Sequence, residues 1–328
     1  MALAASVLLS FIPAFIYAVM VYWMDRYEKE PKLLLGGVFL WGAVVAAGAA
    51  FILNTIFGIT IFALTDSSAL ADLATGSISA PLFEESLKGM AVLIVFLIFR
   101  KEFDSVMDGI VYAGIAALGF AATENVLYLY ERGFLEGGWE DLGYVFVLRV
   151  ILGPWNHPFY TAFTGIGLAA SRLNKNKLIK FSAPVIGWGV SLFTHAFHNS
   201  LASFAEGSGG LALIILVDWM GWIFMAAVIL WAVLKEKKWI QLELREEVRQ
   251  GVISAQQYRV ASSAWKRGVA KWSGLGDGKY KATKHFYQLC TELAYKKHQF
   301  SRLGETRGNS QQMIDSLREE TRKLAPKV

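Results

Sequence analysis

Apolar runs long enough to cross a lipid bilayer recur along the first 234 of the 328 residues. A membrane-spanning helix needs about 20 mostly apolar residues. Runs of this kind cover seven stretches, at 3–23, 33–57, 78–99, 106–130, 142–170, 181–204 and 210–234. Hydrophobic residues make up 55% of the chain and charged residues only 18%, whereas an average soluble domain is about a quarter charged. The sequence therefore predicts an all-α, polytopic helical membrane bundle, and it excludes an ordinary soluble enzyme, a disordered chain and a fibrous protein.

We expect seven transmembrane helices, and an eighth within residues 58–77 is the alternative. The first run lacks a positively charged start and a convincing cleavage site, so we expect it to be a retained helix. The fifth run is too long for one straight helix, and Gly153, Pro154 and Pro158 interrupt it. Because proline lacks a backbone N–H, this run is expected to be one kinked helix or two short ones.

Basic residues alternate between the loops that join these runs. The loops after the first, third and fifth runs carry Arg26, Lys29, Lys32, Arg100, Lys101, Arg172, Lys175, Lys177 and Lys180. Residues 58–77 and 205–209 contain no Lys or Arg, and residues 131–141 contain only Arg132. Cytoplasmic loops of membrane proteins carry an excess of Lys and Arg. The pattern predicts that the N-terminus lies outside and the C-terminus in the cytoplasm.

The charge distribution divides the chain into two expected domains. Residues 235–328 carry 20 Lys and Arg against 10 Asp and Glu, a net charge of +10, so residues 1–234 have a net charge of −5. We expect a transmembrane helical bundle over 1–234 and a small, basic, helical cytoplasmic region over 235–328. The anionic lipids of the inner leaflet would attract such a tail, so the overall basic charge does not require nucleic acid as a partner.

Ionisable residues inside the apolar runs are the most informative part of the sequence, because they are costly in a membrane and usually functional. They and their polar neighbours are Glu84, Glu85, Lys88, Glu124, Asn125, His157, His195, His198 and Asn199. With the expected topology, Glu84 and Glu124 lie about 9 Å and His195 about 13 Å from the outer ends of their helices. These side chains are therefore expected to meet at one level in the outer leaflet.

Carboxylates and imidazoles around one pocket allow a narrow range of chemistry. They can deprotonate a water molecule and return the proton to a leaving amine, and Asn199 or an imidazole can donate to a developing oxyanion. Alternatively, two histidines and one glutamate can hold a catalytic zinc ion with an open fourth position. A purely structural reading also exists: Glu84, Glu85 and Lys88 could form an ion-paired cluster, and His198 is more typical of a structural residue.

Four motifs on successive helices resemble those of the PrsW family of intramembrane proteases. They are Glu84-Glu85-x-x-Lys88, Phe120-x-x-x-Glu124-Asn125, His157 and His195-x-x-x-Asn199. The resemblance covers about residues 10–205 and extends to the broader group of CAAX endopeptidases and bacteriocin-processing enzymes. It implies an integral protein of the bacterial cytoplasmic (inner) membrane that hydrolyses membrane-spanning proteins such as anti-sigma factors. Members have been called metalloproteases, whereas relatives support a glutamate-activated water without metal.

The resemblance also suggests roles for individual residues. Glu84 or Glu85 would act as the general base, and His195 and Asn199 would polarise the carbonyl. Proton transfer or metal binding falls to the remaining pocket residues, and a divalent metal such as zinc would take its ligands from Glu85, Glu124, His157 and His195. Supporting positions are Lys88, Phe120 and Asn125. Many family members have Asp where this chain has Asn199, which argues against a metal-ligand role there.

Two other functions are compatible with the residues alone. A proton-coupled transporter would use the buried Glu and His side chains as a proton relay, and it predicts paired broken helices in two pseudo-symmetric halves. A non-catalytic scaffold or receptor would instead depend on the basic tail. Both alternatives differ from the protease in what mutation of Glu84, Glu85 or the tail would abolish.

Overall fold

The computed structural model describes residues 1–205, 207–304 and 310–328, and every regular element in these ranges is a helix. The chain divides into two compact units. We call residues 1–24, 30–172 and 176–228 the membrane unit, and residues 25–29, 173–175 and 229–328 the tail unit. The division therefore falls inside one long helix, α10 (Gly207–Arg249).

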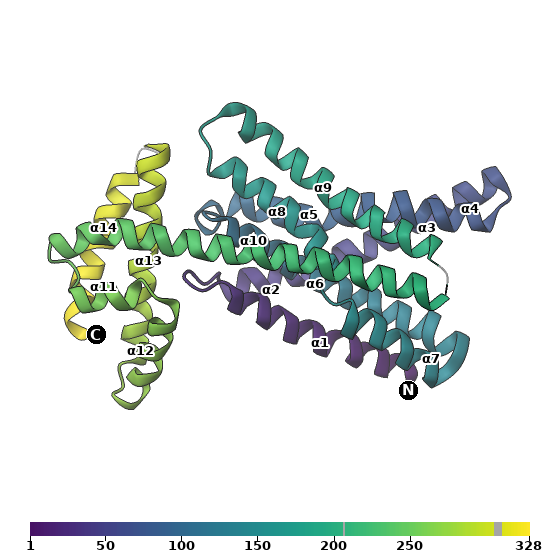
Figure 1. Cartoon of the computed structure of the whole chain (residues 1–328), viewed down its shortest axis with the longest axis horizontal. Helices are drawn as coiled ribbons and strands as arrows, with labels where there is room; N and C mark the ends of the chain where they lie inside the picture. The colour runs from purple at the N-terminus through teal and green to yellow at the C-terminus, as the bar shows by residue number, and fades with distance from the viewer. Residues whose placement is uncertain (206, 305–309) are drawn as a thin grey trace. The chain divides into compact units, whose positions relative to one another are not determined.

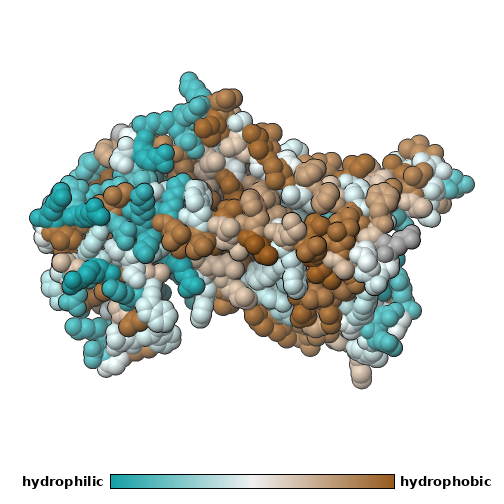
Figure 2. Space-filling view, in the orientation of Figure 1, coloured by the Kyte–Doolittle hydropathy of each residue, from teal (hydrophilic) through white to brown (hydrophobic). Residues whose placement is uncertain are grey.

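The membrane unit is a bundle of α-helices interrupted by short π-helical and 3₁₀ segments (Figure 1). In chain order before α10 they are α1 (Ala2–Met24), α2 (Lys32–Leu40), η1 (Trp41–Ala46), α3 (Ala47–Thr65), α4 (Ser68–Ala74), η2 (Thr75–Ser79), α5 (Ala80–Ile98), η3 (Arg100–Glu102), α6 (Val106–Leu127), η4 (Tyr128–Phe134), α7 (Leu135–Phe146), η5 (Val147–Leu152), α8 (Asn156–Arg172) and α9 (Lys177–Phe204). Apolar side chains cover much of the outer surface of this unit (Figure 2).

Four continuous helical stretches in the described residues are long and apolar enough to cross a membrane: Ala2–Met24, Lys32–Thr65, Val106–Arg172 and Gly207–Arg249. The count of seven spans stays a prediction. Residues 58–77, expected as a loop or an eighth span, are largely helical, because α3 continues to Thr65 and α4 begins after the Ser67 cap. With seven residues, α4 is far too short to span a bilayer by itself.

The stretch Val106–Arg172 changes direction at two places. Gly137 and Gly138 have non-helical backbone angles, and Gly138 has a φ of 73°, a left-handed conformation that glycine adopts without strain. The expected loop 131–141 is thus only a glycine kink. The second break lies between η5 and α8, at residues 153–155, where the sequence predicted an interruption beside Pro154. This break places His157 in the first turn of α8.

Helix α6 forms the centre of the membrane unit, and its residues from Met107 to Ala122 are buried. Glycines bring its backbone against its neighbours. A methyl group added at Gly109 would collide with Gly165 of α8, and one at Gly119 would collide with Phe39 of α2. Small residues permit this close helix packing in membranes. The helices that carry the candidate site are therefore held at backbone contact distance.

The tail unit folds around its own apolar core. Besides the end of α10 it contains α11 (Ala255–Ala261), α12 (Ala264–Gly276), α13 (Tyr280–Leu303), α14 (Ser310–Leu324) and η6 (Ala325–Lys327). Glu247 is fully buried and accepts hydrogen bonds from Lys297 Nζ at 2.7 Å and Arg318 Nε at 2.8 Å. Cys290, the chain's single cysteine, is fully buried in the core, and burial raises the pKa of its thiol to about 12.

Glu247→Ala should destabilise the tail unit by about 3 kcal/mol, because it leaves two cations without their buried carboxylate. Glu319 is the matched control: it pairs with Arg322 on the surface, and such exposed pairs contribute less than about 1 kcal/mol. The alkylation rate of Cys290 by N-ethylmaleimide measures opening of the core. Equal rates in the two variants would contradict the central role of Glu247.

Candidate active site

Glu85 of α5 is the most completely bound carboxylate of the membrane unit. Its side chain has no solvent exposure, and Lys88 Nζ lies 2.5 Å from its Oε1. Thr161 of α8 and Ser191 of α9 donate hydrogen bonds to Oε2 at 2.7 and 2.8 Å. His195 Nδ1 of α9 lies 2.9 Å from Oε1. Glu85 therefore ties three helices together and has no free oxygen for a reaction.

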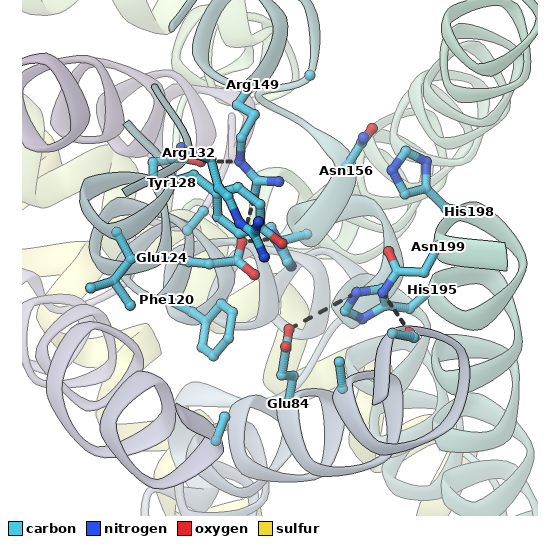
Figure 3. A pocket seen from close by; sticks show the side chains of 18 of the residues that line it. Glu84, Phe120, Glu124, Tyr128, Arg132, Arg149, Asn156, His195, His198 and Asn199 are labelled. Carbon is cyan, nitrogen blue, oxygen red and sulfur yellow. Dashed lines mark hydrogen bonds and ion pairs between the residues drawn. The ribbon is translucent and has the colours of Figure 1, made fainter. Parts of the chain in front are cut away.

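Glu84, the preceding residue, points in a different direction and lines a cavity (Figure 3). Its Oε1 accepts a long hydrogen bond of 3.4 Å from Asn54 Nδ2. Its Oε2 is buried, has no hydrogen-bond partner among the described residues, and lies 3.9 Å from both Lys88 Nζ and His195 Nε2. A buried carboxylate oxygen without a partner is costly, so Glu84 is the carboxylate that is available for chemistry.

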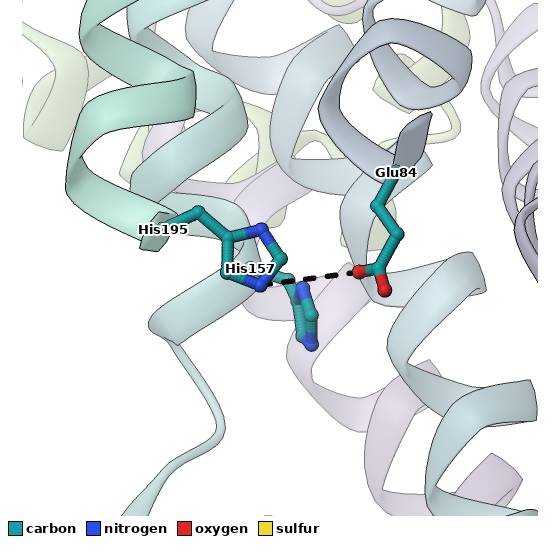
Figure 4. Close-up of side chains that lie close together, drawn as sticks. All are labelled: Glu84, His157 and His195. Atoms are coloured by element: carbon teal, nitrogen blue, oxygen red, sulfur yellow. Dashed lines mark ion pairs between the residues drawn. The ribbon is translucent and has the colours of Figure 1, made fainter. Parts of the chain in front are cut away.

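His195 presents one ring nitrogen to Glu84 (Figure 4). Because Glu85 accepts a proton from Nδ1, the lone pair of the neutral ring is on Nε2, which faces Glu84. The ring stacks on Tyr160 of α8 with 4.8 Å between centroids. His195 is thus oriented as a proton acceptor. Asn199, one turn further along α9, donates to the backbone oxygen of Gly76 at 2.8 Å and also lines the cavity.

His157 has partners on both ring nitrogens. Lys88 Nζ lies 3.0 Å from Nδ1, and Glu124 Oε2 lies 2.9 Å from Nε2. An ammonium group can only donate, so Nδ1 accepts and Nε2 donates its proton to Glu124. Phe120 closes this group, because Lys88 Nζ lies 4.4 Å from the centre of its ring.

Arg149 of η5 neutralises Glu124. Its Nη2 lies 2.5 Å from Glu124 Oε2, and its Nε donates to Asn125 Oδ1 at 2.9 Å. The guanidinium lies 3.6 Å from the centre of the Tyr128 ring, a favourable cation–π arrangement. Glu124 is therefore saturated by Arg149 and His157, and the Asn125 amide holds the arginine in place.

These side chains surround a cavity of about 760 Å³. Its walls come from α3, η2, α5, α6, η4, η5, α8, α9 and α10. The structure brings together all the expected site residues: Glu84, Glu124, Asn125, His157, His195, Asn199 and Phe120 line the cavity, while Glu85 and Lys88 lie behind them. The helix break before α8 is what brings His157 to the level of Glu84 and His195.

Glu84, His157 and His195 form a group that could hold a metal ion, with ligand atoms all within 4.8 Å of one another. This group includes Glu84, where the sequence led us to expect Glu85 and Glu124, whose oxygens are taken up by other partners. One carboxylate and two imidazoles are ligands of open, catalytic zinc sites. The unpartnered Oε2 of Glu84 and the free Nε2 of His195 fit such an ion. His157 fits once it gives up its contact with Lys88 or Glu124.

Sequence reasoning missed three polar residues of this cavity. Arg149 and Asp218 were noted as isolated charges in their spans and given no chemistry, and Asn156 was not considered. Each has a partner in the structure, since Asp218 binds Asn156 and His198 at 2.9 and 2.8 Å. The available signal was the cost of a lone charge inside an apolar run, which predicts a partner on another helix and does not identify it.

Comparison with known proteins identifies relatives of this chain. A family model described as "PrsW family intramembrane metalloprotease" matches residues 30–233, more than half of the chain. "Protease PrsW" of Geobacillus kaustophilus (strain HTA426) is 36% identical over 112 residues, which are 34% of this chain and 46% of that protein. The protein of the same name from Clostridioides difficile (strain 630) is 34% identical over 126 residues, 38% of this chain and 50% of that protein.

A third relative, "Protease PrsW" of Bacillus subtilis (strain 168), is 27% identical over 210 residues, 64% of this chain and 83% of that protein. The chain thus spans about half the length of the first two relatives and most of the third. No solved structure matches the chain.

Replacing the two adjacent glutamates should separate anchoring from reactivity. Glu85→Ala removes the partner of four side chains and should cost about 3 kcal/mol or more of unfolding free energy, because it leaves Lys88 unpaired in the bundle. Glu84→Gln has the same shape and loses one weak hydrogen bond, so its cost should stay below about 1 kcal/mol. Thermal unfolding of the detergent-solubilised variants measures both. A Glu84 variant as unstable as the Glu85 variant would contradict this division of roles.

Lys88→Met should tighten zinc binding at least about tenfold, because it removes a fixed positive charge beside the ligand atoms and frees Nδ1 of His157. Lys88→Arg is the matched control, since it keeps the charge and should keep the weaker binding. Isothermal titration of the solubilised protein with Zn²⁺ measures the dissociation constants. In the Lys88→Met background, His195→Ala should remove the gain. Identical affinities for wild type and Lys88→Met would argue against these three ligands.

Proposed function

Because the chain belongs to the PrsW family of intramembrane metalloproteases, we propose that it is an intramembrane endopeptidase that hydrolyses a peptide bond of membrane-protein substrates. The observation that carries this proposal is the arrangement of Glu84 and His195. Two groups able to accept a proton, Glu84 Oε2 and His195 Nε2, face each other at 3.9 Å on the wall of a large buried cavity. General acid–base hydrolysis needs such a pair.

Glu84 is the proposed general base. A water molecule beside Oε2 would give its proton to this carboxylate while its oxygen attacks the carbonyl carbon of the substrate. The same proton would pass to the leaving amine when the C–N bond breaks, so that Glu84 returns to its starting state. Glu85 has a positioning role, because it accepts the proton of His195 Nδ1 and fixes the direction of Nε2.

His195 assists in the same step as the second proton acceptor beside the water, and a protonated ring would be stabilised by Glu85. Lys88 and Arg149 place positive charge near the cavity and would favour the negative charge that develops on the carbonyl oxygen. The second N–H of the Asn199 amide is a further candidate donor to that oxygen. His157 and Glu124 complete the pocket.

A divalent metal ion such as zinc would be held by Glu84, His157 and His195. When bound, it would polarise the substrate carbonyl and acidify a coordinated water. The residues around these ligands suit that role, since Glu85 orients His195 through its other ring nitrogen, as carboxylates commonly do for metal-binding histidines. Chemistry with or without metal thus uses the same oxygen of Glu84.

The proposal extends to substrate, orientation and domains. The substrate class is a spanning protein of the anti-sigma-factor kind, cut near the extracytoplasmic face of the bacterial inner membrane. The alternation of basic loops supports an external N-terminus and a cytoplasmic C-terminus. Residues 1–234 would form the catalytic bundle, and the basic region 235–328 would lie against anionic lipid on the cytoplasmic side. Nothing in this scheme needs nucleic acid.

Glu84→Gln and His195→Ala should each lower the cleavage rate by about 10²- to 10⁴-fold, the usual contribution of a positioned acid–base group. Glu136→Gln is the matched control, because Glu136 forms an exposed pair with Arg132. The assay co-reconstitutes the purified chain in liposomes with single-span anti-sigma factors of its own organism and identifies products by mass spectrometry. Wild-type cleavage by both site variants would exclude this mechanism.

A further inference from the structure

Asp218 of α10 is the only acidic residue between Gly207 and Lys235. It lies about 17 Å along the helix, deep in the expected membrane region. A carboxylate at this depth is costly unless it has partners. The partners are His198 Nδ1 of α9 at 2.8 Å and Asn156 Nδ2 of α8 at 2.9 Å. The proposed reaction uses none of these three side chains, so their network needs its own explanation.

This network connects α10 directly to the reactive part of α8. Trp222 of α10 donates its Nε1 proton to Asn156 Oδ1 at 3.0 Å, so Asn156 binds α10 through both ends of its amide. His157 is the next residue of the chain. A displacement of α10 would therefore release the residue that precedes a side chain of the site.

Apart from this network, α10 is loosely attached to the bundle. Only 6% of its most apolar 18-residue window is buried, against 89% for the stretch that contains α6 and α8. Its apolar side chains, such as Met220 and Ile223, point outward and are exposed. One close approach exists in its centre, where a methyl group added at Gly221 would lie 3.0 Å from the ring of Phe159 of α8.

The inner side of α10 forms a wall of the cavity. Leu211, Ile214, Ile215 and Asp218 line it opposite the walls that carry Glu84, His157 and His195. His198 and Asn156 line the same cavity, and Figure 3 shows them on the side of His195 and Asn199. A path between α8 and α10 would thus lead from the lipid directly to the reactive groups.

We propose that the seam between α8 and α10 is where the transmembrane helix of the substrate binds and reaches the site. This route rests on the proteolytic function proposed above. An apolar helix matches the apolar faces of the seam. A peptide bond inside a helix must lose its backbone hydrogen bonds before hydrolysis, and free backbone groups in a membrane need new partners. Asp218, His198 and Asn156, once separated, supply both acceptors and donors for them.

A reversible cross-link tests the seam. Phe159→Cys/Gly221→Cys places two thiols across it, and a short bis-methanethiosulfonate reagent joins them until dithiothreitol is added. We expect cross-linking to lower cleavage of a reconstituted anti-sigma factor at least about tenfold and reduction to restore it, since access is blocked while the site is intact. The control is Ser86→Cys/Trp188→Cys, at an α5–α9 contact of 3.1 Å, which should leave cleavage unchanged. Full activity of the cross-linked Phe159/Gly221 variant overturns the proposal.

A second measurement needs no substrate. Spin labels at Phe193 of α9 and Met220 of α10, both exposed, report the distance between these helices by pulsed electron resonance. Asp218→Leu should lengthen and broaden the distribution, whereas Asp218→Asn, which can still accept from Asn156, should stay close to wild type. Identical distributions in all three proteins overturn the seam. Absence of cleavage in the untreated protein would instead count against the protease, and the label distances would still decide the seam.

Discussion

The fold depends on one buried pair of opposite charges, Glu85 and Lys88, one turn apart on α5. Two charges removed from water are costly unless each is fully paired and hydrogen-bonded. Glu85 meets this condition only because Thr161, Ser191 and His195 approach it from two other helices. The charge pair therefore specifies how α5, α8 and α9 meet. Their meeting also turns the neighbouring Glu84 toward the cavity and fixes which nitrogen of His195 faces it.

Saturation of hydrogen bonds distinguishes the structural from the reactive groups. Glu85 and Glu124 have every oxygen engaged by cations, hydroxyls or imidazoles, so they serve as fixed negative charges. Glu84 Oε2 and His195 Nε2 lack strong partners and lie next to each other. Lys88 adds a constraint that a list of motifs does not convey. Its ammonium occupies the position beside His157 that a metal ion would need, so metal binding and the lysine contact compete.

Much of the bundle and its site could be predicted from the sequence. Hydrophobic runs predicted helices, Pro154 predicted the break before α8, and the depths of Glu84, Glu124 and His195 predicted that they would meet. The difference between Glu84 and Glu85 could not be predicted, because adjacent helical residues differ only by direction, and the neighbouring helices decide which direction is buried. The partners of Asp218 were equally inaccessible, because spacing along one chain does not identify contacts between distant helices.

The glycine contacts of α6 divide the membrane unit into parts of very different stiffness. Gly109 against Gly165 and Gly119 against Phe39 are backbone contacts without intervening side chains, so rotamer changes cannot alter the spacing of these helices. The distance between Glu124 on α6 and His157 on α8 is therefore fixed by main-chain volume. A small molecule that bridges these two residues would find its target already shaped, whereas one that reaches toward α10 would have to select among several widths of the cavity.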